Sequence, residues 1–388
     1  MLSRKSPLLA AVMLASSQMT FANDLNINGF MSVGAGVLSN SDVSQAGYDD
    51  DVSFDQDTLI ALQVSKQINE STSATTQFVA RGNEDYDTEN TWAYITYSIN
   101  ENTDIRLGRL RSPFFYYSDF LEVGYAYNWV RPPEEVYARL DPFSSVNGFD
   151  LTHNFSVGST DGSIQFYYGR SSETITPAVK SFDVDLKDFT GVVLNLNNGN
   201  WGTRLSYHQT DATIDDINAI TESSDAELNA ILTSADSSPA ELLVAQATQN
   251  GLGDEFKLDD ATGKFIEAAV TYDNGDYFMI AEWTALDYES ELFVDDSAYL
   301  ISTAKRFNDT VVHLTYTARE DEKGSGVVGN IQNNFLRDKE DSIILGARFD
   351  YDAGTAFKVE AQYIDEELRD GQESESAMLY TVAVDVVF

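Results

Sequence analysis

The chain alternates apolar and polar residues with a period of two, and this pattern recurs along nearly its whole length. The C-terminal run is the clearest case. Thr381, Ala383 and Asp385 fall on one face of a strand, and the other face carries Met378, Tyr380, Val382, Val384, Val386 and Phe388. In a membrane barrel the apolar face meets lipid and the polar face meets the lumen. A soluble sandwich also alternates, but rarely over strands this long, so the pattern favours an all-β, transmembrane antiparallel β-barrel.

The alternation divides the chain into 16 candidate strands, whose ends carry an error of roughly two to four residues. These segments are 25–37, 57–67, 73–82, 89–99, 104–111, 149–157, 163–170, 188–196, 200–210, 262–273, 276–288, 296–306, 310–320, 339–351, 355–366 and 375–388.

The links between these strands alternate in length. Links after even-numbered strands are short and rich in turn residues, as in Asn197-Asn198-Gly199 and Asp273-Asn274-Gly275. Links after odd-numbered strands are mostly longer. Short periplasmic turns and long extracellular loops are typical of outer-membrane barrels, and random segmentation would not produce the asymmetry.

The N-terminus predicts export. Arg4 and Lys5 precede an apolar stretch over 7–15, and Thr20-Phe21-Ala22 offers small residues where a signal peptidase cleaves. We expect 1–22 to be a signal peptide and 23–388 to form the barrel; a buried N-terminal helix is the alternative. No other stretch reaches the roughly 18 apolar residues that a membrane helix needs.

Charge and composition exclude several classes of protein. Without 1–22 the chain has 22 basic and 63 acidic residues, a net charge of −41, which excludes nucleic acid as a partner. The 20 Tyr and 22 Phe argue against disorder. The chain contains no cysteine, so disulfides and thiolate chemistry are absent.

The sequence carries no recognisable catalytic or metal-binding motif. It has three histidines without paired metal-ligand spacing, and no Gly-x-Ser-x-Gly elbow or nucleotide loop. We therefore expect no enzyme activity, no cofactor and no metal. By alternation, polar side chains of the later strands should line the pore, namely Arg204, His208, Glu267, Glu282, His313, Arg319, Arg348, Lys358 and Glu360.

Two long links stand out. The fifth loop, 211–261, should be an extracellular loop that is partly helical, because Ser224 to Glu227 and Ser238 to Glu241 resemble capping boxes and Gly251 suits a helix end. The third loop, 112–148, is aromatic and contains prolines.

Together these features resemble the Gram-negative trimeric porins. Leu107-Gly108-Arg109 is similar to the glycine-arginine of the porin constriction, and Pro133-Glu134 to the porin loop that folds into the pore. Phe388, with Tyr380 upstream, resembles the signal read by the barrel-assembly machinery. The resemblance implies a homotrimer in the outer membrane, in contact with lipopolysaccharide and lipid, but it does not assign a subfamily.

A barrel of 16 strands is too wide for its own side chains to fill, so something must narrow it. We expect the third loop to do so, with Glu134 and Glu135 facing Arg81, Arg109 and Arg111 across the opening. Strict alternation would place Arg109 on the same face of the strand as Leu107, two residues earlier. We therefore expect Arg109 to point inward only because of the resemblance, which a local bulge near Gly108 would make possible. Alternatively, these arginines only pair with loop carboxylates at the surface.

These features predict a porin that lets small hydrophilic solutes and ions diffuse passively, with a weak cation preference. A substrate-specific channel is the alternative, in which aromatic residues of the third loop form a sugar-stacking track; a barrel enzyme or adhesin is a third. The aromatic residues could equally pack the loop against the wall. They are Phe114, Phe115, Tyr116, Tyr117, Tyr125, Tyr127 and Trp129.

Overall fold

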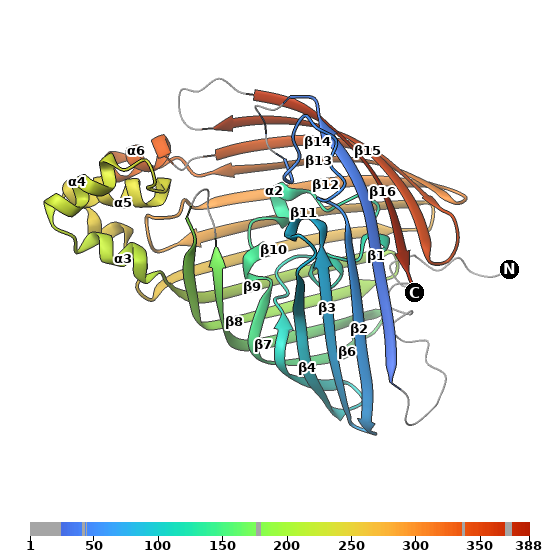
Figure 1. Ribbon diagram of the computed structural model, residues 1–388. Helices are drawn as coiled ribbons and strands as arrows, with labels where there is room; N and C mark the ends of the chain where they lie inside the picture. Colours follow the sequence, from blue (N-terminus) through green and yellow to red (C-terminus); the bar gives the residue numbers. More distant parts are fainter. Residues whose placement is uncertain (1–24, 41–42, 44, 176–179, 336–337, 369–374) are drawn as a thin grey trace.

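The computed structural model describes residues 25–40, 43, 45–175, 180–335, 338–368 and 375–388. The expected signal peptide lies outside the described residues. The strands form a single closed barrel in which every strand pairs antiparallel with its neighbours in sequence, and the first strand pairs with the last (Figure 1). The predicted 16-stranded antiparallel barrel is confirmed.

The strand bounds follow the alternation closely. They are β1 Asn26–Leu38, β2 Leu59–Asn69, β3 Thr72–Arg81, β4 Thr88–Asn100, β5 Thr103–Arg111, β6 Ser145–Val157, β7 Thr160–Ile175, β8 Phe182–Asn198, β9 Trp201–Thr213, β10 Ala261–Asp273, β11 Tyr277–Tyr288, β12 Asp296–Phe307, β13 Thr310–Asp321, β14 Asp338–Asp350, β15 Thr355–Leu368 and β16 Glu375–Val387.

The largest shift of a single strand end is at β8, which begins six residues earlier than predicted, at Phe182 rather than 188. In this added part the apolar Val184 and Leu186 are buried while Asp183 and Lys187 are exposed. The pattern is the reverse of a lipid-facing strand. A search for apolar residues on the outer face therefore misses it.

The fifth loop contains three α-helices at one end of the barrel, α3 Asp215–Thr221, α4 Asp225–Thr233 and α5 Pro239–Gln249 (Figure 1). Both predicted capping boxes are confirmed. At the second, Ser238 Oγ accepts the Glu241 amide at 3.2 Å and the Ser238 amide donates to Glu241 at 2.9 Å. Gly251 follows α5 at φ +74°. The seventh loop contributes a further helix, α6 Gly326–Phe335, which lies beside α5. None of the helices that the structure describes is long and apolar enough to cross a membrane.

The third loop, which links β5 to β6, runs inside the barrel. It contains the helix α2 Glu134–Tyr137 and the short 3₁₀ turns η2 Ser118–Phe120, η3 Gly124–Ala126 and η4 Asp141–Phe143. Helix α2 packs against β12 and β13. The loop thus occupies space that the strands leave open.

The C-terminal residue completes the seam of the barrel. Gly29 and Phe388 exchange two backbone hydrogen bonds, of 2.8 and 2.9 Å, beyond the end of β16. The Phe388 ring lies over Gly29, where an added Cβ would meet ring atoms at 2.5 Å.

Deleting Phe388 is therefore expected to reduce the amount of folded barrel much more than deleting 234–237, the link between α4 and α5. The deletion removes both seam hydrogen bonds, whereas the link lies outside the barrel wall. The measurement is the fraction of protein that changes electrophoretic mobility on heating. A normal folded fraction in the Phe388 deletion would contradict this expectation.

Candidate pore constriction

The wall formed by the later strands holds the start of the third loop through buried charged side chains. Arg204 of β9 donates to the Phe114 carbonyl at 3.0 Å and to the Pro113 carbonyl, and it pairs with Glu267 at 2.5 Å. Glu282 of β11 accepts the Tyr116 amide at 2.9 Å. Because these are charge-assisted bonds in a buried setting, they fix the loop backbone strongly.

The middle of the loop is held by two cations from β14 and β15. Arg348 Nη1 donates to the carbonyls of Tyr125 and Tyr127 at 2.7 and 2.8 Å. Lys358 Nζ donates to the carbonyls of Gly124 and Trp129 at 2.6 and 2.5 Å. Together with Arg204 and Glu282, they form a set that we call the loop anchors, Arg204, Glu282, Arg348 and Lys358.

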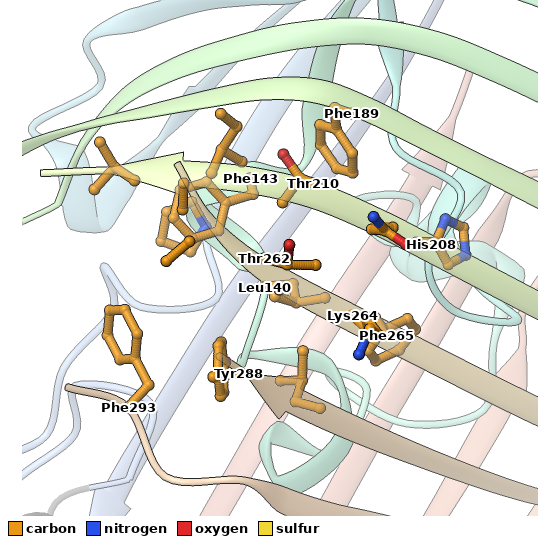
Figure 2. A pocket seen from close by; sticks show the side chains of 18 of the residues that line it. Leu140, Phe143, Phe189, His208, Thr210, Thr262, Lys264, Phe265, Tyr288 and Phe293 are labelled. Atoms are coloured by element: carbon orange, nitrogen blue, oxygen red, sulfur yellow. The ribbon is translucent and has the colours of Figure 1, made fainter. Parts of the chain in front are cut away.

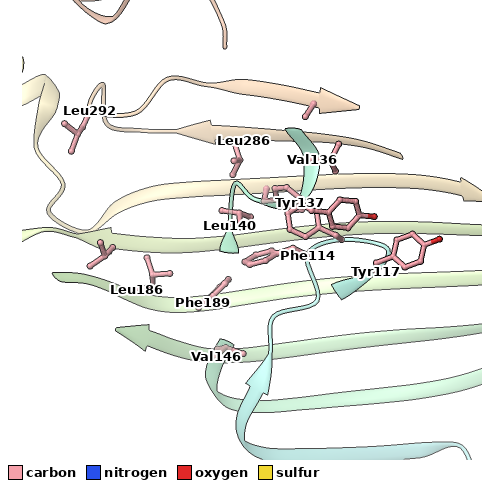
Figure 3. Packing of buried hydrophobic residues seen from close by; sticks show 14 of the residues in the cluster. Phe114, Tyr117, Val136, Tyr137, Leu140, Val146, Leu186, Phe189, Leu286 and Leu292 are labelled. Carbon is pink, nitrogen blue, oxygen red and sulfur yellow. The ribbon is translucent and has the colours of Figure 1, made fainter. Parts of the chain in front are cut away.

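The aromatic residues of the loop pack it against this wall (Figure 3). Tyr117 and Trp129 are only 1% and 2% exposed, and Phe114 lies edge-on to Phe265 with ring centroids 5.4 Å apart. The Trp129 indole also donates to Thr315 at 2.8 Å. The burial of these rings agrees with the interpretation that they pack the loop against the wall. A sugar-stacking track would require rings that are exposed to the passage.

Most side chains predicted to line a watery pore are buried under the third loop. They face the interior, as alternation predicted, but the loop covers them and they contact protein. This corrects the expectation of solvent-lined positions for Arg204, His208, Glu267, Glu282, His313, Arg348, Lys358 and Glu360. Arg319 alone of the predicted group is partly exposed. Alternation gives the face of a strand, and it carries no information about what covers that face.

The solvent-accessible part of the interior lies on the opposite wall. From β2 to β7, inward polar side chains below the loop are only partly buried, namely Gln63, Ser65, Thr75, Thr96, Arg106, Thr152 and Gln165. Arg106 Nε binds both carboxylate oxygens of Asp150, at 3.0 and 2.8 Å. A polar wall of this kind suits the passage of hydrated solutes.

The predicted arginines meet where this wall approaches the third loop. Arg81 pairs with Glu84 at 3.1 Å, with Glu89 at 3.0 Å and with Glu122 of the loop. Glu122 also pairs with Arg111 at 3.4 Å. Arg109 pairs with Glu89 at 3.2 Å and with Glu173 at 3.7 Å. These residues form a candidate constriction, and we call them the constriction cluster: Arg81, Arg109, Arg111, Glu84, Glu89, Glu122 and Glu173.

The direction of Arg109 depends on Gly108. Leu107 is 52% exposed on the outer face, yet Arg109 shares the carboxylate of Glu89 with Arg81. Gly108 has φ +140°, a conformation that side-chain-bearing residues rarely adopt. The pairing of β5 with β4 continues past Gly108 without a register shift, so the strand has no bulge there. The unusual backbone conformation of Gly108, and not the expected bulge, goes together with the inward direction of Arg109.

The structure does not bring Glu134 and Glu135 against the arginines. Helix α2 instead places Glu135 beside Ser342, fully buried, where burial raises its pKa. Glu134 accepts the Ala46 amide at 2.9 Å in the first loop and lies near Arg131, which binds Asp57 through two hydrogen bonds. Glu122 is the loop carboxylate at the cluster. Sequence reasoning missed Glu122, because neither alternation nor a turn signal marks a single carboxylate within this irregular loop.

No known family model matches the sequence, and no curated protein matches it in sequence. Solved structures do resemble the barrel. The outer-membrane channel DcaP of Acinetobacter baumannii is 11% identical, with a TM-score of 0.60 over 96% of this chain and 99% of that one. Salmonella typhi OmpF, solved with daunomycin, is 13% identical, with a TM-score of 0.58 over 95% and 98%. The chain has the fold of the Gram-negative outer-membrane porins.

A third porin-fold structure, the anion-selective porin from Comamonas acidovorans, is 11% identical and has a TM-score of 0.56 over 94% of this chain and all of that one. At such identities the likeness concerns the fold. The selectivity named for the Comamonas porin therefore belongs to that protein alone.

Proposed function

We propose that this chain is an outer-membrane channel through which small hydrophilic solutes and ions diffuse passively. The observation that carries the proposal is the third loop, which is folded into the barrel and held to one wall so that a polar strip stays accessible on the other. A plugged barrel would bury both walls. No step in this function breaks or forms a bond, so the proposal assigns the chain no enzyme activity, cofactor or metal.

In this function the protein lies in the outer membrane of the cell. The signal peptide directs export, the long-loop end faces outward among lipopolysaccharides, and the barrel-assembly machinery reads Phe388 with Tyr380. Tyr380 is 52% exposed on the outer face of β16, as that role requires. Three copies assemble as a homotrimer, and nucleic acid is not a partner.

The constriction cluster supports a weak cation preference. It sets four carboxylates against three guanidinium groups, and the strongly acidic chain should concentrate cations at both vestibules. Since nearly all these charges are paired, their electric field at the passage should be small. We therefore expect the preference for cations over anions to be modest.

A salt gradient across a planar bilayer is expected to give a reversal potential of the sign for cation preference. The magnitude should shrink as the mean salt concentration rises from about 0.1 M to about 1 M, because the Debye length falls from about 10 Å to about 3 Å. Strong anion selectivity at low salt would contradict this part of the proposal.

A further inference from the structure

A cavity of about 550 Å³ lies inside the barrel toward the long-loop end, between the third loop and the strands β7 to β11 (Figure 2). Its walls are mainly apolar, with Leu140 and Phe143 from the third loop, Leu186 and Phe189 from β8, Phe265 from β10 and Phe293 from the sixth loop. A passage for hydrated solutes needs a polar lining. Diffusion through the porin therefore gives no reason for this apolar space.

The size and lining of the cavity suit a bound molecule. The cavity is partly open, so a small molecule can enter it. Sites for small molecules typically have 300–1,000 Å³ and apolar walls with a few polar groups. This cavity has both properties.

One buried polar atom in the wall lacks a protein partner. His208 is 1% exposed, and its Nδ1 lies 2.8 Å from the Tyr167 hydroxyl. Its Nε2 has no hydrogen-bond partner among the described residues. By contrast, the hydroxyls of Thr210 and Thr262 donate to the Lys187 carbonyl and to Asp211. Burying a nitrogen without a partner is unfavourable, and a ligand hydrogen bond would remove that cost.

The charges at the cavity are already compensated. Arg139 contacts Asp296, and Lys264 pairs with Asp287 at 3.1 Å. A charged ligand would lose hydration without gaining a free counter-charge, and burying an unpaired charge is costly. We propose that this cavity binds an uncharged, largely apolar small molecule that shares one hydrogen bond with His208 Nε2.

The test uses 2-naphthol and naphthalene as probes, titrated calorimetrically into the purified full-length protein in detergent, with protein-free micelles as the blank. The naphthol hydroxyl both donates and accepts, so it suits either tautomer of His208. Wild-type protein should bind both probes saturably. Val184→Trp fills the cavity from β8 and should weaken binding of both at least tenfold. The matched control is Val192→Trp, which puts the same side chain on the exposed outer face of β8 and should bind as wild type does.

His208→Phe separates the hydrogen bond from the apolar contacts. It should weaken 2-naphthol binding about three- to tenfold, the value of one hydrogen bond, and leave naphthalene binding unchanged. Absence of saturable binding to the wild type, or wild-type affinity in a folded Val184→Trp variant, would overturn the proposed site. Unchanged 2-naphthol affinity in His208→Phe would overturn the role of the histidine. Conductance is not a readout here, so the outcome is independent of the proposed channel function.

Discussion

Replacing Lys358 with methionine is expected to release the third loop and raise the single-channel conductance by roughly twofold, since an open barrel of this size is wide. Methionine keeps most of the length of the side chain but removes two hydrogen bonds to the loop and the 2.9 Å ion pair with Asp385. The two lost hydrogen bonds are the ones that reach the loop, so the loop should detach while the strand ladder remains. The broken ion pair joins β15 to β16, so its cost, about 3–5 kcal/mol for a buried pair that loses one partner, destabilises the wall and not the loop contact. The measurement is single-channel conductance in planar bilayers.

Two further variants isolate the cause. In Lys358→Met with Asp385→Asn, no unpaired charge remains in the wall, so the folded fraction should recover while the conductance stays high. Lys66→Met changes an exposed lysine of β2 and should conduct as wild type does. A folded Lys358→Met variant with wild-type conductance would show that the anchor does not hold the constriction.

Changing single charges in the constriction cluster is expected to move ion selectivity in opposite directions. Glu122→Gln should shift the permeability ratio toward anions, and Arg109→Ser should shift it toward cations and raise conductance. A unit charge about 8 Å from the ion path changes the energies of a cation and of an anion by about 0.5 kcal/mol each, with opposite signs, so the cation-to-anion ratio should change about fivefold in water. Reversal potentials at low salt measure both shifts.

The matched control for these charges is Glu101→Gln, an exposed carboxylate in the turn between β4 and β5. It removes the same charge as Glu122→Gln at a distance from the loop, so its reversal potential should stay near the wild-type value. Equal shifts in Glu122→Gln and Glu101→Gln would mean that selectivity follows overall charge rather than the cluster.

The barrel was predictable because lipid imposes its own pattern on the sequence. Every membrane-crossing strand must turn apolar side chains outward, so alternation marks both the strand and its register. The prediction failed where the constraint ends. Phe182 to Lys187 of β8 reverse the pattern: the apolar side chains there are buried, and Val184 and Leu186 line the cavity instead of meeting lipid.

The site was less predictable than the fold. The arginines could be selected because charged residues on an inward face have few uses other than lining a passage or binding something inside. Their partners depend on the path of a loop that has no periodicity. Thus Glu122 lies at the cluster, whereas the motif-like Glu134 lies against the first loop. Similarly, Lys358 and Arg348 were assigned to the inner face from sequence, but their binding of loop carbonyls needed the structure.

The central claim is a water-filled passage that the third loop narrows, and single-channel recording with neutral polymers tests it most directly. Wild-type protein should open in discrete steps, and small polyethylene glycols should lower the step size until a cut-off above which they are excluded. Lys358→Met should move that cut-off to larger polymers. A purified, folded protein that forms no conducting steps, or a cut-off that is the same in both proteins, would contradict the account.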